Sequence, residues 1–121
     1  MSMYTELLIK AQIRSGIPED VEHVLQHLFN GGAIPQALPD HPFFKCVRWP
    51  LIGRSGSHYH VPFATSAYRE GYLFSRSDLK NYGCEIKEFI SWVKPYIDAP
   101  AGACIGWEWY EEDDYPTLIL M

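Results

Sequence analysis

Two histidines near the middle of the chain are the first candidates for chemistry, because imidazole both binds metals and transfers protons. His58 and His60 flank Tyr59 in a stretch that we predict to be a strand, so both imidazoles project from one face. The pair could reach one metal ion or one phosphate, with His41 or an acidic turn as a further ligand. No HExxH or HxxEH motif accompanies it. Two half-exposed histidines on a polar strand face are the more common explanation, and a metal-assisted or acid–base hydrolase using His58 and His60 is the alternative.

A second histidine pair has the spacing of a metal-binding helix. His23 and His27 are four residues apart, and Glu19 precedes them by one turn. Projection at about 100° per residue places both histidines opposite the apolar stripe of the predicted helix. We therefore expect both to lie on a solvated helix face.

Basic residues near the start of the second predicted helix form a candidate anion site. Arg76 and Lys80 lie just before this helix, whose free N–H groups favour negative charge. The alternative is that Asn81 or a neighbouring polar residue caps the helix while Lys80 is solvated. The candidate ligands for an anion are Arg48, Arg76, Lys80, Asn81, His58 and His60.

Nucleophile and phosphate-loop motifs are absent from the sequence. The segment 53–56 does not match a GxSxG elbow, and neither GxxxxGK[ST] nor GxGxxG occurs. The three cysteines, Cys46, Cys84 and Cys104, include no CxxC pair, which is typical of reduced thiols in the cytosol. We predict no catalytic residue and no cofactor.

Aromatic residues are abundant, with 8 Tyr, 6 Phe and 4 Trp. Tyr and Trp are enriched at interfaces, and those near the irregular middle of the chain are candidates to line a pocket or a dimer surface. These interface candidates are Trp49, Tyr59, Tyr68 and Tyr72. Trp107 and Trp109 share a predicted strand face with Ile105, so we predict that both pack in the core of the sheet.

Carboxylates are concentrated near the C-terminus, at position 108 and at 111–114. Such a run is typical of a solvated hairpin turn. Binding of a hard cation or of a basic partner is the alternative.

The elements that must position these residues follow from hydrophobic periodicity. The predicted strands are 4–14, 43–48, 58–64, 71–76, 104–110 and 116–120, and the predicted helices are 18–30 and about 82–94. The order β-α-β-β-β-α-β-β predicts a single α+β domain over residues 1–121, with an irregular Pro- and Gly-rich segment at 33–57. We expect a mostly antiparallel sheet with two helices on one face, as a variant of the ferredoxin-like arrangement.

The overall charge is acidic. The 15 Asp and Glu outnumber the 10 Lys and Arg, which gives a net charge of -5. Non-specific binding to nucleic acid or to an anionic membrane requires a basic surface, so we predict neither. No apolar run is long enough to cross a membrane and no signal peptide is recognised, so we expect a cytoplasmic protein.

Several short stretches carry a resemblance to known proteins. They are His41-Pro42-Phe43-Phe44, Arg48-Trp49-Pro50, 77–82 (SDLKNY), Glu85-Ile86, Phe89, Trp92, Pro95-Tyr96 and 110–119 (YEEDDYPTLI). Together they resemble a group of small uncharacterised proteins from tailed phages and prophages, over most of the chain from Tyr4 onward. The resemblance implies a phage-borne accessory protein in the host cytoplasm, and it implies no mechanism.

The sequence therefore favours a small accessory binding protein over an enzyme. We expect it to bind a partner protein or a small anionic ligand, and to self-associate. The alternatives are the hydrolase that uses His58 and His60 and a structural or assembly subunit.

Overall fold

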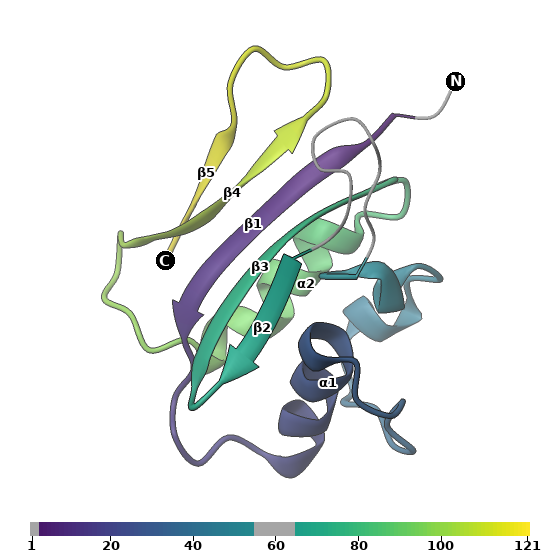
Figure 1. Ribbon diagram of the computed structural model, residues 1–121, viewed down its shortest axis with the longest axis vertical. Helices are drawn as coiled ribbons and strands as arrows, with labels where there is room; N and C mark the ends of the chain where they lie inside the picture. Colours follow the sequence, from purple (N-terminus) through teal and green to yellow (C-terminus); the bar gives the residue numbers. More distant parts are fainter. Residues whose placement is uncertain (1–2, 55–64) are drawn as a thin grey trace.

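Five strands form one antiparallel sheet in the computed structural model, which describes residues 3–54 and 65–121. The order across the sheet is β2-β3-β1-β4-β5, and every neighbouring pair is antiparallel (Figure 1). The strands are β1 (Thr5–Gln12), β2 (Thr65–Arg69), β3 (Tyr72–Leu79), β4 (Cys104–Tyr110) and β5 (Thr117–Leu120).

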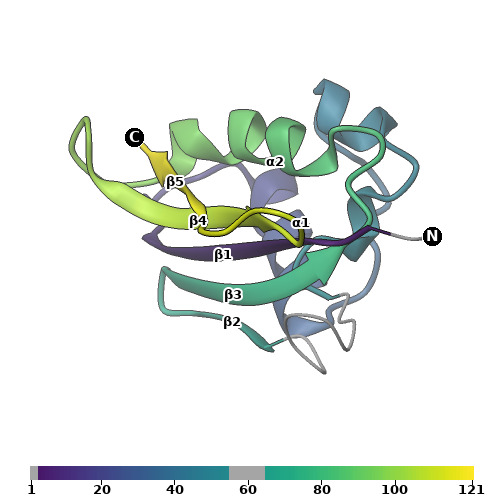
Figure 2. The ribbon, with the colours of Figure 1, turned by 90° about the horizontal axis from the view of Figure 1, so that it is seen from above.

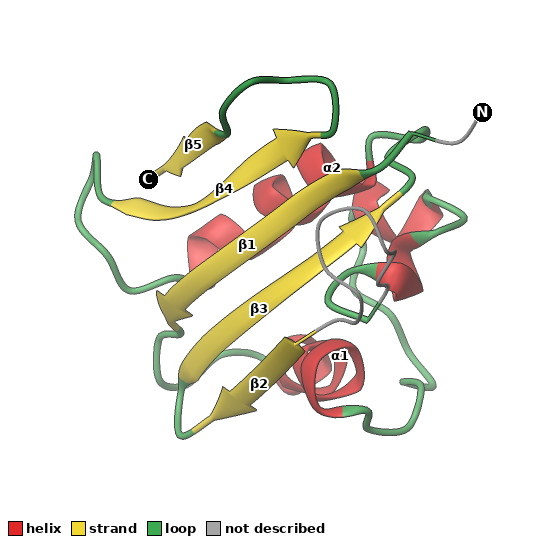
Figure 3. Ribbon diagram, turned by 45° about the horizontal axis from the view of Figure 1, so that its top comes forward, coloured by secondary structure: helices red, strands yellow, loops and turns green. Residues whose placement is uncertain are grey.

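Two α-helices cover one face of this sheet. They are α1 (Glu19–Asn30) and α2 (Glu85–Val93). Figure 3 shows both helices behind the strands, α2 behind β1 and α1 behind β2, and Figure 2 shows the layer that α2 forms above the sheet. The chain order β1-α1-β2-β3-α2-β4 with β1 between β3 and β4 is the split βαβ arrangement of ferredoxin-like folds, and β5 adds a strand at one edge. The predicted fold class is confirmed.

The core lies between the sheet and the two helices. Leu7 and Ile9 alternate along β1 and are at most 1% exposed, as the period of two predicts. Leu25 from α1 and Phe89 from α2 are fully buried against this face. Because each such side chain contributes about 1.5–3 kcal/mol when fully buried, these periodic positions dominate the stability of the fold.

The prediction of a strand at 43–48 is wrong. Its first part belongs to a short 3-10 helix, η1 (Pro42–Lys45), and a second 3-10 helix, η2 (Trp49–Leu51), follows it. Pro42 has the preset backbone angle of a helical first turn, and the His41 ring accepts a hydrogen bond from the Phe43 amide at 3.0 Å. The fully buried Phe43 ring then packs against Trp49, Phe89 and Trp92. A third short helix, η3 (Lys94–Tyr96), continues α2.

The boundaries of the other predicted strands differ by at most a few residues from those in the structure, where the structure describes them. The predicted strand 58–64 lies outside the described residues, and β2 begins at Thr65. The predicted strand at 71–76 corresponds to β3, which continues to Leu79. None of the helices in the described ranges is long and apolar enough to cross a membrane.

The prediction that Trp107 and Trp109 are core residues is also wrong. The register between β4 and β5 shifts between Cys104 and Gly106, which is a β-bulge that interrupts the alternation of side chains. Ile105 therefore points to the core, with 2% of its surface exposed, while Trp107 and Trp109 lie half-buried on the opposite face.

Candidate functional site

The sheet face that the described helices leave uncovered carries two exposed aromatic rings. We call it the open face. Tyr72 and Phe74 project from β3 onto this face, 62% and 41% exposed, while their neighbour Leu73 points to the core. Large apolar rings this exposed on adjacent positions of one face are typical of a binding surface.

The register of the sheet places one cation beside each ring. Tyr72 pairs across to Arg69 of β2, and Phe74 pairs across to Lys10 of β1. Directly opposite residues in an antiparallel pair have Cβ atoms about 4.5–5.5 Å apart, so each ring and its cation are neighbours. Around them lies a groove of about 480 Å³, which we call the face trough. Its lining residues are Lys10, Ala11, Gln12, Ala67, Arg69, Tyr72, Leu73 and Phe74.

The face trough is positively charged within an acidic protein. Its lining carries Lys10 and Arg69 and no carboxylate. Both cations are exposed, and neither forms an ion pair with another residue of the described chain. The rings offer flat stacking surfaces and the cations offer attraction for an anion, so this arrangement suits a ligand that combines a flat ring with negative charge.

Arg76 lies on the open face but is already paired. Its Nε donates a hydrogen bond to Glu6 Oε1 at 3.0 Å, and Trp107 Nε1 donates to the same oxygen at 3.3 Å. The Glu6 side chain is 1% exposed, so both donors stabilise a buried carboxylate.

The other predicted anion ligands do not converge with Arg76. Arg48 lies over the ring of Tyr82, with its Cζ 5.3 Å from the ring centroid, and Lys80 Nζ lies 5.9 Å from the ring centroid of Tyr4. Asn81 Oδ1 accepts a hydrogen bond from the Ile86 amide at 3.0 Å at the start of α2, which is the capping alternative. Arg76 faces away from this helix on the other side of the sheet, and His58 and His60 lie outside the described residues.

The interface candidates divide by burial. Trp49 and Tyr68 are both 6% exposed and belong to the core, so neither is a surface residue. Tyr68 hydroxyl donates to Glu22 Oε2 at 2.6 Å, and burial together with this bond raises the pKa of Tyr68 well above its ordinary value. Tyr72 is exposed on the open face, and Tyr59 lies outside the described residues.

The expectation for His27 is wrong, and that for His23 is confirmed. His23 is exposed, with Nε2 3.6 Å from Glu19 Oε1. His27 is 7% exposed because η2 packs beside the end of α1, with the Trp49 ring 5.9 Å from the imidazole. Its Nε2 lies 3.2 Å from Arg54 Nη1, and its Nδ1 lies 2.8 Å from the Gly32 carbonyl oxygen. Because a guanidinium only donates, Nε2 accepts and Nδ1 donates, so neither nitrogen is left for a metal.

Metal ligands do not gather elsewhere in the described ranges. No group of three or more His, Cys, Asp or Glu side chains there could hold a metal ion. The hydrolase alternative depends on His58 and His60, which the described ranges do not include.

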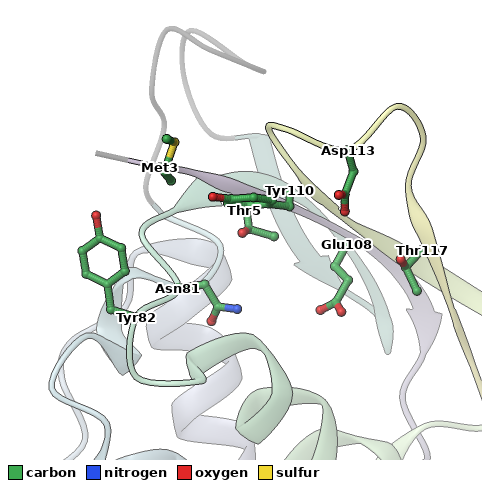
Figure 4. A pocket seen from close by; sticks show the side chains of 8 residues that line it. All are labelled: Met3, Thr5, Asn81, Tyr82, Glu108, Tyr110, Asp113 and Thr117. Carbon is green, nitrogen blue, oxygen red and sulfur yellow. The ribbon is translucent and has the colours of Figure 1, made fainter. Parts of the chain in front are cut away.

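A second cavity lies at the end of the sheet, next to the loop that leads into α2. We call it the end pocket (Figure 4); its volume is about 380 Å³. Thr5 pairs with Tyr110 across β1 and β4, and Glu108 pairs with Thr117 across β4 and β5. The complete lining is Met3, Thr5, Asn81, Tyr82, Glu108, Tyr110, Asp113 and Thr117.

The end pocket is electronegative. Glu108 is half-buried, and its carboxylate makes no hydrogen bond or ion pair within the described part of the chain. Burial, and then the charges of Glu112, Glu111 and Asp113, raise the pKa of Tyr110 above its ordinary value. The sequence pattern predicts that these carboxylates belong to one solvated turn. In the structure, pairing between β4 and β5 directs Glu108 into the end pocket instead.

Comparisons with known proteins give no relative from which a function could be transferred. No protein-family model, no curated protein and no solved structure matches this chain.

Proposed function

We propose that this chain is a binding protein and that the face trough binds a small anionic ligand with a flat ring, such as a nucleotide. The observation that carries this proposal is the register that sets Arg69 beside Tyr72 and Lys10 beside Phe74. A base can stack on either ring while its phosphate contacts either cation.

The expected affinity is modest. Stacking of a base on an aromatic ring contributes about 1–3 kcal/mol. An exposed ion pair adds about 0–1 kcal/mol because water and salt screen it. A single nucleotide should therefore bind with a dissociation constant on the order of 1 mM or weaker.

A free nucleotide and a nucleotide within a single strand offer the same chemistry. The net charge of -5 disfavours a long polyanion, since most of it would lie outside the two-cation trough. We therefore favour the free nucleotide. A comparison of AMP with a single-stranded pentanucleotide at two salt concentrations separates the two sources.

The test is an NMR titration of the amide resonances with AMP, adenosine and ribose 5-phosphate. AMP should bind more tightly than either fragment, because it alone provides both the ring and the charge. Tyr72→Ala should weaken AMP binding roughly tenfold by removing a stacking surface. Lys10→Gln should weaken AMP and ribose 5-phosphate but not adenosine.

The matched controls are Tyr115→Ala and Lys87→Gln. Tyr115 is 74% exposed in the β4–β5 turn, and Lys87 is an exposed cation on α2. Neither control should change the affinity for AMP. Equal affinities of AMP and ribose 5-phosphate, or equal effects of Tyr72→Ala and Tyr115→Ala, would rule out a stacking site.

A second candidate is docking of a second copy of this chain on the other end of the open face. Leu118 and Leu120 of the edge strand β5 are 57% and 47% exposed, and they favour an apolar contact. An assembly or phage accessory role would use such a surface. Light scattering of the protein at increasing concentration tests self-association, and Leu118→Lys with Leu120→Lys should abolish it.

A further inference from the structure

The end pocket has chemistry opposite to that of the face trough. Its lining carries two carboxylates, Glu108 and Asp113, and no Lys, Arg or His. We propose that it binds a small organic cation with a primary ammonium group, independently of any ligand on the open face.

An unpaired hydroxyl on a largely buried residue supports this ligand more specifically than the carboxylates do. Thr5 is 9% exposed, and its hydroxyl makes no hydrogen bond with another side chain or backbone group in the described ranges. Figure 4 shows the Thr5 side chain extending from β1 toward the same space as Asn81 and Glu108. A hydroxyl that lines a cavity without a protein partner is free to accept a hydrogen bond from an N–H group of a ligand.

The donor set fits an ammonium ion better than a metal ion. An ammonium group has three N–H donors, and the Glu108 carboxylate with the Thr5 and Thr117 hydroxyls supplies acceptors. Calcium requires six or more oxygen ligands, whereas the described residues contain no cluster of three acidic, His or Cys ligands.

Aromatic rings provide the remaining surface of the end pocket. Tyr82 and Tyr110 both line it, and a cation over a phenol ring is attracted by the ring electrons. The Tyr82 ring already has the Arg48 guanidinium 5.3 Å from its centroid. Lys87 and Lys94 border a separate hollow beside Glu108, and neither forms an ion pair with it among the described contacts.

The test uses 1,4-diaminobutane as the probe at pH 7 and constant ionic strength. We expect saturable shifts of the amide resonances of Thr5, Asn81 and Thr117. Tetramethylammonium and sodium should not reproduce these shifts, because neither donates a hydrogen bond. Glu108→Gln should weaken binding roughly tenfold, since it removes a charge that contacts the ammonium group.

The matched control is Glu112→Gln, which removes an exposed carboxylate from the same turn but not from the pocket lining. Thr5→Val provides a second probe, because it deletes the hydroxyl and keeps the side-chain shape. Melting temperatures establish that each variant is folded. Equal weakening by Glu108→Gln and Glu112→Gln, an unchanged affinity in Thr5→Val, or the same shifts with tetramethylammonium would overturn the proposal. Lys10→Gln leaves this assay unchanged, so its outcome is independent of the nucleotide test.

Discussion

Tyr68 shows how one polar contact ties a helix to the sheet. Its ring is buried in the core, and its hydroxyl donates a hydrogen bond to Glu22 of α1 at 2.6 Å. Burial and this bond both favour the protonated phenol, so the pKa of Tyr68 in the folded protein is raised above the ordinary value of 10.0. The unfolded chain loses both effects, so the free energy of unfolding must change with pH in the alkaline range.

Tyr68→Phe should lower the free energy of unfolding by about 1–2 kcal/mol at pH 8 because it removes this hydrogen bond. The contribution is complete below the unfolded pKa of about 10 and is lost as pH rises above it, since only the unfolded tyrosine ionises there. The difference between wild type and Tyr68→Phe should therefore shrink between about pH 9 and pH 11. Urea unfolding at these pH values checks it, with the exposed Tyr115→Phe as the control. Parallel pH curves for wild type and Tyr68→Phe would contradict the assignment.

At the scale of elements, Asn30 protects the edge strand β2. From the end of α1, its Oδ1 accepts a hydrogen bond from the Tyr68 amide at 2.9 Å, and its Nδ2 donates to the Tyr68 carbonyl at 2.6 Å. One side chain thus supplies both bonds that a neighbouring strand would make. This contact satisfies backbone groups that would otherwise be open to pairing with another chain.

Asn30→Ala should destabilise the protein by about 1–2 kcal/mol, because two buried backbone groups of β2 lose their partners. Amide hydrogen exchange at Tyr68 should accelerate by the corresponding factor. Gln26→Ala is the control, since it removes the contacts of Gln26 with Asn30 Nδ2 and with Glu22 Oε1 but leaves the two bonds between Asn30 and Tyr68. If both variants exchange equally fast at Tyr68, the helix end rather than the edge contact is responsible.

The elements with strict periodicity could be predicted from the sequence, and those set by distant contacts could not. The alternation in β1 and the apolar stripes of the two α-helices are local patterns, and they correctly give the fold class. The stretch around Phe43 is determined by packing against Trp92, far away in the chain, so its local composition misleads. The β4 bulge reverses the face of Trp107, and the isolated Gly106 inside the strand pattern is the sequence signal that could have indicated it.

At the scale of the whole molecule, the two cavities depend on register, which the sequence does not supply. Arg69 and Tyr72 are close along the chain, but Lys10 meets Phe74 only through the pairing of β1 with β3. Glu108 reaches the end pocket only because β4 lies between β1 and β5. Among the described residues, Arg76 does not meet the other predicted anion ligands for the same reason, since Arg76 and the start of α2 lie on opposite sides of the sheet.

The pairing of the β4–β5 hairpin with β1 supports the whole end pocket, and the backbones of β4 and β1 are in close contact at Gly106. A Cβ atom at Gly106 would overlap the Leu8 carbonyl oxygen of β1, which is backbone and cannot move aside. Gly106→Ala should therefore separate β4 from β1 and cost more than about 3 kcal/mol, at the upper end of single substitutions. Gly102→Ala is the control: Gly102 also has a positive φ, +84°, but a Cβ there meets nothing within 4 Å, so it should cost only about 1 kcal/mol. Urea unfolding measures both values. Similar stability of the two alanine variants would contradict the close packing at Gly106.

Ligand binding by folded Gly106→Ala tests whether the two cavities are independent. The face trough is built on β1, β2 and β3, whereas the end pocket needs the β4–β5 hairpin. We therefore expect this variant to lose diaminobutane binding and to retain AMP binding.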